Sequence, residues 1–316
     1  MQSSDRIARR INLHDLQVLM AVVQAGSMNK AAVVLNMSQP TVSRSIAELE
    51  RAVGVRLLDR NAQGAEPTAN GRALLDGGTA VFDDLRQAVK NIEFLADPAA
   101  GEVRIGCNPL LAATFVSAVV DRLTRRYPRV VSHLATAAQV ETLYRELNDR
   151  NLDLLIRRRF GPVADERHEF EFLFDDSSFY VVAGAQSPWV RRRKIALAEL
   201  VNESWVLPPP DGRTGSHAMD AFRANGLAYP RTTVITGDAH LRISLLTTGH
   251  FLTILSASVL RFPNRLPEVK VLPVELPTAR VSVGITTLKN RTLNPVARLF
   301  MEHARDVAKP PAKRKG

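Results

Sequence analysis

The sequence predicts an α/β protein made of a helical N-terminal head, one long helix and a larger body. In residues 12–58, apolar residues recur at the spacing of short amphipathic helices that are joined by tight loops. Residues 69–96 continue one helical pattern without a loop. From Gly101 onward, short apolar runs alternate with helical stretches, which is typical of parallel strands joined by crossover helices.

The composition limits the classes of protein to which the chain can belong. The chain has 316 residues, of which 45% are hydrophobic and 23% charged, so it can bury a sizeable core. Cys107 is the one cysteine, which excludes an internal disulfide and a thiol-rich metal centre. The first residues lack the apolar core of a secretory signal, and the most apolar stretch, Leu241–Leu260, contains Arg242. We therefore expect a cytoplasmic protein without a membrane span, in which this stretch is a buried helix and strand.

The net charge of +10 is compatible with a nucleic-acid partner but does not locate one. Residues 1–100 contain as many acidic as basic side chains, so the rest of the chain carries the excess. The basic runs Arg191–Lys194 and Ala312–Gly316 are typical of solvated surface. Motifs must therefore identify any DNA-binding part.

Three short helices are predicted in the head, each preceded by a residue that can cap its N-terminus. The caps are Asn12, Ser27 and Ser38, and the helices end near Gly26, Leu35 and Gly54. One apolar stripe runs along the third helix, made by Val42, Ile46, Leu49 and Val53. Three helices at this spacing predict a helix-turn-helix.

A hairpin and a long helix follow the head. Residues 55–68 read as two short strands around a glycine-containing loop, the pattern of a wing. Thr68 then caps a helix that runs to about Ala96. Its apolar residues alternate steps of four and three, which predicts a seam for a second copy of the helix: Val81, Leu85, Ala88, Ile92 and Leu95.

The segment AAVVLNMSQPTVSRSIAELERAVGVRLLDR, residues 31–60, resembles the helix-turn-helix signature of LysR-type transcriptional regulators. The resemblance continues in order through PTANGRALL, GEVRIG, RYPRV and LDLLI, and so covers nearly the whole chain. It implies a winged helix-turn-helix, a dimerising linker helix and an effector domain of two α/β lobes similar to periplasmic solute-binding proteins. Leu58 stands where the family usually has Phe, and the wing loop lacks the basic residues of many relatives.

On this basis the expected domains can be given by residue number. We expect the DNA-binding domain in residues 1–68, the linker helix in 69–97, the effector domain in 101–308 and a basic tail in 309–316. Lobe I is expected at about 101–157 and 275–308, and lobe II at about 158–274.

The third helix is expected to read DNA, because a recognition helix presents its N-terminal residues to base edges. Gln39 can pair with adenine, Arg44 can reach guanine, and the Thr41 methyl group can contact thymine. Other residues suit the phosphate backbone. The full candidate set is Ser27, Ser38, Gln39, Pro40, Thr41, Ser43, Arg44 and Arg60. The competing interpretation is a capped surface helix with ordinary polar residues.

An effector is expected beyond the carboxyl ends of the strands, where open α/β sheets bind ligands. The candidates are Asn108, Pro109, Leu110, Gln139, Val140, Arg157, Pro208, Thr236, Gly237 and Ser256. One of the three arginines from Arg157 to Arg159 could neutralise an anionic effector, although a solvated charged turn fits at least two of them. Ordinary loop and cap residues are the competing interpretation for the whole set.

The resemblance implies promoter DNA, a small-molecule effector and RNA polymerase as partners. It also implies that the chain associates with itself, as a homodimer or a homotetramer. No cofactor, metal spacing, nucleophile elbow or phosphate loop is indicated. A solute-binding protein, an enzyme acting in the cleft and a DNA-bending nucleoid protein remain alternatives. Cys107 fits a small buried side chain better than a redox group, because it has no partner thiol.

Overall fold

The computed structural model describes residues 2–61, 64–137, 139–160, 166–230, 232–262, 268–276 and 281–309. The chain divides into two compact units, residues 1–88 and 89–316.

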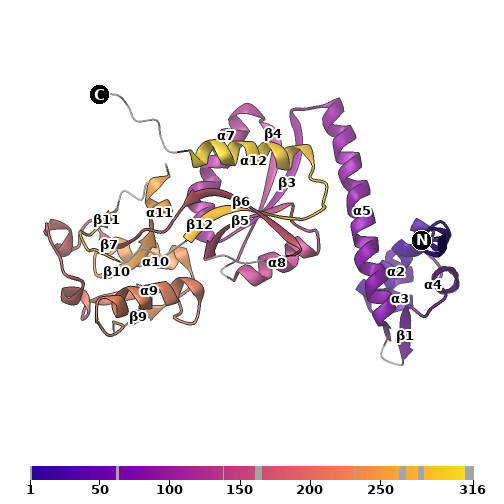
Figure 1. Cartoon of the computed structure of the whole chain (residues 1–316), viewed down its shortest axis with the longest axis horizontal. Helices are drawn as coiled ribbons and strands as arrows, with labels where there is room; N and C mark the ends of the chain where they lie inside the picture. The colour runs from indigo at the N-terminus through magenta and orange to yellow at the C-terminus, as the bar shows by residue number, and fades with distance from the viewer. Residues whose placement is uncertain are drawn as a thin grey trace. The chain divides into compact units, whose positions relative to one another are not determined.

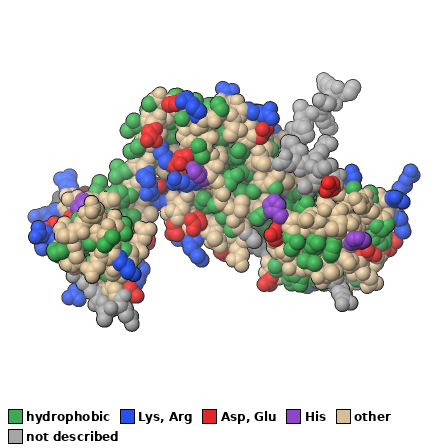
Figure 2. Space-filling model, turned by 180° about the vertical axis from the view of Figure 1, so that it is seen from behind, with side chains coloured by type: hydrophobic (Ala, Val, Ile, Leu, Met, Phe, Trp, Pro, Cys, Tyr) green, Lys and Arg blue, Asp and Glu red, His purple; other side chains and the backbone are tan. Residues whose placement is uncertain are grey.

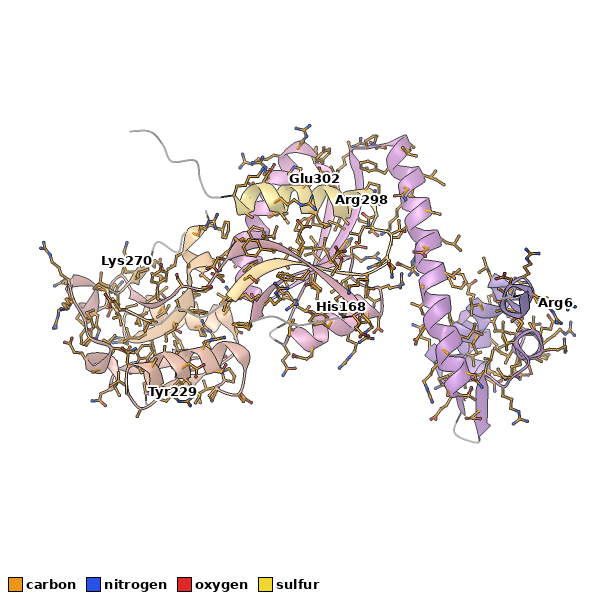
Figure 3. The ribbon with its side chains drawn as sticks, in the orientation of Figure 1. Arg6, His168, Tyr229, Lys270, Arg298 and Glu302 are labelled. Atoms are coloured by element: carbon orange, nitrogen blue, oxygen red, sulfur yellow. The ribbon has the colours of Figure 1, made fainter. Side chains whose placement is uncertain are left out.

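The first unit begins with four helices (Figure 1): α1 Gln2–Ala8, α2 Leu13–Ala25, α3 Met28–Val34 and α4 Gln39–Val53. The three predicted helices are confirmed, and their caps Asn12, Ser27 and Ser38 each accept a backbone N–H bond. Helix α1 was not predicted; it carries the exposed Arg6 (Figure 3). Helices α2 and α4 pack through Leu19, Ile46 and Leu49, which are almost fully buried.

The predicted wing is confirmed as an antiparallel hairpin of β1 Leu58–Asn61 and β2 Gly64–Pro67. Leu58 is only 3% exposed, so it provides the apolar anchor that Phe gives in many relatives. The hairpin leads directly into α5 Ala69–Ala96, whose first turn is capped by Thr68 through a 3.0 Å bond from the Gly71 N–H.

The beginning of α5 is held tightly against the head by two glycines. A Cβ on Gly71 would lie 2.0 Å from the backbone oxygen of Leu57, and a Cβ on Gly78 would lie 3.0 Å from the Leu16 side chain. Gly78 thus marks a close approach between α5 and α2. Any larger residue at Gly71 would push α5 away from the wing.

The second unit contains two five-stranded sheets (Figure 1). The first has the order β4-β3-β5-β12-β6 and is made of β3 Ala100–Cys107, β4 Arg129–Thr136, β5 Leu154–Phe160, β6 His168–Asp175 and β12 Val281–Leu288. Helices α7 Ser117–Arg126 and α12 Pro295–Ala308 cover one face, and α8 Val140–Asn148 covers the other. A short helix α6 Pro109–Leu111 and a π-helical turn η1 Ala112–Val116 precede α7.

The second sheet has the order β11-β7-β10-β8-β9. Its strands are β7 Phe179–Gly184, β8 Ser204–Leu207, β9 Thr232–Ile235, β10 Phe251–Ser256 and β11 Val269–Val271. Helices α9 Arg213–Ala224 and α10 Ala239–Thr247 pack on opposite faces, and α11 Ala257–Arg261 follows β10. Short 3-10 turns at Pro188–Arg191 and Leu197–Leu200 complete this lobe.

The sheets are mixed rather than purely parallel. Strand β3 pairs parallel to β4 and β5, as the alternation predicted, whereas β12 pairs antiparallel to β5 and β6. Strand β6 was not predicted, and it extends the first lobe to Asp175. The chain therefore passes into the second lobe near Asp176, whereas the boundary between the lobes was expected after Arg157.

The apolar stretch Leu241–Leu260 forms most of α10 and all of β10, the predicted helix and strand, and it continues into α11, which was not predicted. Among the described residues, no helix is both long and apolar enough to cross a membrane. On the face shown in Figure 2, the Lys and Arg side chains are scattered over the surface rather than gathered in one patch.

Candidate DNA-binding surface and effector site

The first two turns of α4 present polar groups to solvent. Ser38 holds the first turn in place: its Oγ accepts a bond from the Thr41 N–H at 3.3 Å and lies 2.7 Å from the Thr41 Oγ1. Gln39, Pro40 and Arg44 are exposed. The other face of α4 is anchored in the head core, so a rigid helix carries these side chains.

The remaining predicted DNA contacts have more limited support. Ser27 is half-buried and caps α3 through the Lys30 N–H at 3.3 Å, and Ser43 is half-buried on α4. The side chain of Arg60 and the wing-tip residues 62–63 lie outside the described residues.

The predicted seam is an exposed apolar stripe on α5. Val81 is 43% exposed, Leu85 46%, Ile92 67% and Leu95 81%, and Ala88 is also exposed. On the same helix Asp83 and Gln87 are buried. Large apolar side chains at such exposure are typical of a surface that a partner covers.

In the second unit, several predicted effector residues shape the loops at strand ends. The Asn108 Oδ1 caps α6 by accepting the Leu111 N–H at 2.8 Å, and the Thr236 Oγ1 accepts the Asp238 N–H at 3.0 Å. Gln139 precedes α8 but makes no side-chain cap bond. These contacts fit the loop-cap interpretation as well as a ligand site.

The arginines at the end of β5 point to opposite faces of the sheet, as alternate strand residues do. Arg157 donates to the Thr286 Oγ1 at 2.9 Å and its guanidinium lies 5.2 Å from the Tyr144 ring centroid. Arg159 lies 3.9 Å over the Phe170 ring. Arg158 points the other way and reaches Ser256 and Ser258 of the second lobe.

Arg158 is the centre of a buried polar cluster between the two lobes. Its Nε donates to the Asp176 Oδ2 at 2.6 Å, and its Nη2 donates to Ser256 at 2.6 Å and Ser258 at 3.0 Å. Asp176 is fully buried and also accepts the Ser258 N–H at 2.8 Å. Among the predicted effector residues, Ser256 is the one that belongs to this cluster.

Arg242 on α10 lies close to the same cluster and was missed as a site residue. It is 3% exposed, and its Nη2 lies 3.4 Å from the Ile254 carbonyl oxygen. Burial lowers the pKa of Arg242 to about 10, and the charge of Arg158 contributes to that lowering. The sequence did contain a signal for a buried polar site, because Arg242 is the one charged residue in the apolar stretch Leu241–Leu260 apart from His250.

An aromatic stack also joins the two lobes. The His217 ring on α9 lies 4.7 Å from the Phe160 ring of β5 at an interplanar angle of 18°. On the second lobe it lies 5.9 Å from Phe179. Burial lowers the pKa of His217, and Asp220 opposes that change.

This stack predicts a loss of stability on mild acidification. Because the folded state holds the His217 pKa below its ordinary value of 6.5, the unfolded chain binds more protons as the pH falls below that value. The stabilising contribution is thus present above pH 6.5 and lost below it. We expect the melting temperature to fall less steeply between about pH 7 and 5.5 in His217→Phe, which keeps the stack without the titration. The exposed His250→Gln is the control, and equal slopes in all three proteins would contradict the prediction.

Cys107 is fully buried at the end of β3, and burial raises the pKa of its thiol to about 12. A neutral buried thiol suits the packing interpretation. No group of three or more His, Cys, Asp or Glu side chains in the described part of the chain is arranged to hold a metal ion.

A cavity of about 340 Å³ lies away from these residues, between the last turns of α5 and the start of α12. Phe94 and Val296 line it together with Lys90, whose Nζ is 2.9 Å from the Glu102 Oε1. None of the predicted effector residues lines it.

Two family descriptions match the chain. Residues 13–72 match the bacterial regulatory helix-turn-helix protein, lysR family, and residues 96–309 match the LysR substrate binding domain. Relatives include the HTH-type transcriptional regulator GbpR of Azospirillum brasilense, 25% identical over 92% of this chain and 84% of GbpR. TfdS, an HTH-type transcriptional regulator of Cupriavidus pinatubonensis, is 27% identical over 93% of this chain and 98% of TfdS.

Solved structures share the fold. CbnR bound to its target DNA matches with a TM-score of 0.53 and 21% identity, over 95% of this chain and 100% of CbnR. A full-length cysteine-to-aspartate variant of OxyR from Pseudomonas aeruginosa matches with a TM-score of 0.62 and 21% identity, over 94% of both chains.

Proposed function

Because this chain belongs to the LysR family of transcriptional regulators, we propose that it binds promoter DNA with the first two turns of α4 and responds to a small molecule held between its two lobes. The helix-turn-helix domain and the substrate-binding domain are those of a DNA-binding regulator. The observation that carries the proposal is the exposed polar turn of α4, fixed by the Ser38 cap.

In this proposal each part has one task. Residues 1–68 bind DNA, with Gln39, Thr41 and Arg44 facing bases. The α5 stripe pairs two chains into a homodimer, and two dimers form a homotetramer on an interrupted palindrome. The effector domain, residues 101–308, binds the ligand without turning it over. We place the protein in the cytoplasm, where its promoter lies, and RNA polymerase is a further partner on the family relationship alone.

In this proposal the effector acts by shifting the population between two arrangements of the protein. A ligand changes the arrangement of the DNA-binding heads only if it binds one arrangement more tightly than the other. The buried cluster around Arg158 supports this role, because it contains groups of β5, α11 and the chain crossing at Asp176. A ligand that reorders these groups would change how the two lobes are held.

The experiment is fluorescence anisotropy of the purified full chain on DNA from upstream of its own gene, over a salt series. Scrambled DNA of equal length is the control. We expect a preference for the native fragment that persists at physiological salt. Equal and steeply salt-dependent binding to both fragments would favour a non-specific DNA-bending protein. Turnover of a bound ligand by the purified protein would favour an enzyme.

A further inference from the structure

The cavity of about 340 Å³ at the end of α5 is formed by three elements of the second unit. Phe94 comes from the last turn of α5, Gly101 from the start of β3, and Val296 from the start of α12. Val296 is 3% exposed, and a Cβ on Gly101 would lie 2.7 Å from its Cγ2, so β3 and α12 are in close contact here. Phe94 and Val296 also pack in the core of the first lobe, which makes the apolar side of the cavity a fixed surface.

Asn294 gives this cavity an unused hydrogen-bond donor. The residue lines the cavity and is only 1% exposed. Its Oδ1 caps α12 by accepting the Ala297 N–H at 2.8 Å, which fixes the Nδ2 on the other side of the amide. This Nδ2 is buried and has no hydrogen-bond partner in the described part of the chain. Because a buried donor without an acceptor is costly, the arrangement points to a bound molecule that supplies an oxygen.

Acidic side chains predominate among the charged groups around the cavity. The carboxylates of Glu93, Asp97 and Glu102 line it. Lys90 is the one basic residue among the described lining residues, and its Nζ already lies 2.9 Å from the Glu102 Oε1. Asp97 is paired with Arg129 at 2.7 Å, whereas the exposed Glu93 makes no ion pair with a described residue. The lining thus has negative charge left over, which disfavours an anion.

We propose that this cavity is a second small-molecule site, which takes an uncharged primary amide with an apolar body. The amide oxygen accepts from the Asn294 Nδ2, and the amide NH2 group donates to a carboxylate of the lining. The apolar body lies against Phe94 and Val296. A carboxylate ligand would add to the unbalanced negative charge, and an alkylammonium ion would leave Asn294 without an acceptor.

This site goes beyond the proposed function, because it is separate from the position between the two lobes. It lies on the part of α5 that belongs to the second unit, and the same helix continues into the first unit, which contains the DNA-binding head. A bound amide contacts the last turns of that helix. We therefore expect it to change promoter affinity, a consequence that rests on the proposed function, whereas the binding itself does not.

Three variants of the full chain locate the binding of any probe. Ala100 lines the cavity, so Ala100→Leu fills part of it. Ala99→Leu is the matched control, because Ala99 is not among the lining residues. Asn294→Ser removes the Nδ2 without adding volume, and a serine hydroxyl still caps a helix. A melting-temperature shift that Ala99→Leu keeps and the other two variants lose comes from the cavity.

The probes share one apolar body and differ in the end group: hydrocinnamamide, hydrocinnamate and the primary amine phenylpropylamine. A ligand that binds only the folded state raises the melting temperature, so we expect the amide to raise that of the wild type by several degrees. The shift should persist in Ala99→Leu and be lost in Ala100→Leu and Asn294→Ser. If the amide gives no shift, or if either cavity variant keeps it, the proposal is wrong. A larger shift with a charged probe, lost in the same two variants, would overturn the amide assignment.

Anisotropy on the native promoter fragment separates the site from the proposed function. We expect saturating hydrocinnamamide to change the promoter affinity of the wild type several-fold and that of Ala100→Leu not at all. An unchanged wild-type affinity, together with a shift located in the cavity, would keep the site and overturn its effect on the head. A lack of promoter preference without any probe would overturn the proposed function and leave the site in place.

Discussion

Replacing Leu85 by Asp is expected to convert the protein to a monomer in sedimentation velocity. Leu85 lies in the middle of the exposed α5 stripe and is 46% exposed in the single chain. A carboxylate there would have to be buried between two helices, where a charge without a partner is costly. Since two linked heads bind a two-part site far more tightly than one head, we also expect operator affinity to fall by about 100-fold or more.

The control for this variant is Asn70→Asp, which places the same charge on an exposed residue of α5 outside the stripe. It should leave the sedimentation coefficient unchanged. If Leu85→Asp sediments like the wild type, the stripe is not the pairing surface, and a different surface must hold any oligomer together.

The Arg44→Ala variant is expected to lose specific operator binding while its fold is unchanged. Arg44 is exposed in the second turn of α4, opposite the buried Ile46 and Leu49 face. A guanidinium that pairs with a guanine edge contributes about 1–3 kcal/mol, so we expect affinity for the operator to drop about 5- to 150-fold. Anisotropy on operator and scrambled DNA measures this directly.

Arg51→Ala is the matched control, because Arg51 is an exposed arginine in the last turn of the same helix. It should change operator preference little. An equal loss on both DNAs in Arg44→Ala would instead assign Arg44 to a phosphate, since phosphate contacts are the same for every sequence.

The head was predictable because its signals are local. Asn12, Ser27, Ser38 and Thr68 each cap the helix that directly follows, and all four accept the backbone bond expected of them. The wing and the apolar stripe likewise depend on residues close together in the sequence.

The body was less predictable because its contacts are distant. Strand β6 pairs with β12 more than a hundred residues later. Its sequence HEFEFLFD begins with alternating charged and apolar residues, a strand signal that the predicted strands did not include. Whether Arg157 or Arg158 faces the second lobe depends on how β5 is turned in its sheet, which a single sequence leaves open. The sequence did single out Arg242 as a charge in an apolar run, but Arg158, whose charge acts on it, lies far from it in the sequence.

The burial of Cys107 makes the protein convenient for spectroscopy. Maleimide reagents attack a thiolate at the surface, whereas this lone thiol is enclosed and its pKa is raised to about 12. Cysteines introduced at exposed Lys270 in one lobe and Arg298 in the other (Figure 3) could therefore be spin-labelled without removing the native residue. The distance between the two labels, measured in the free protein and in its complex with the promoter fragment, would show directly whether the lobes rearrange.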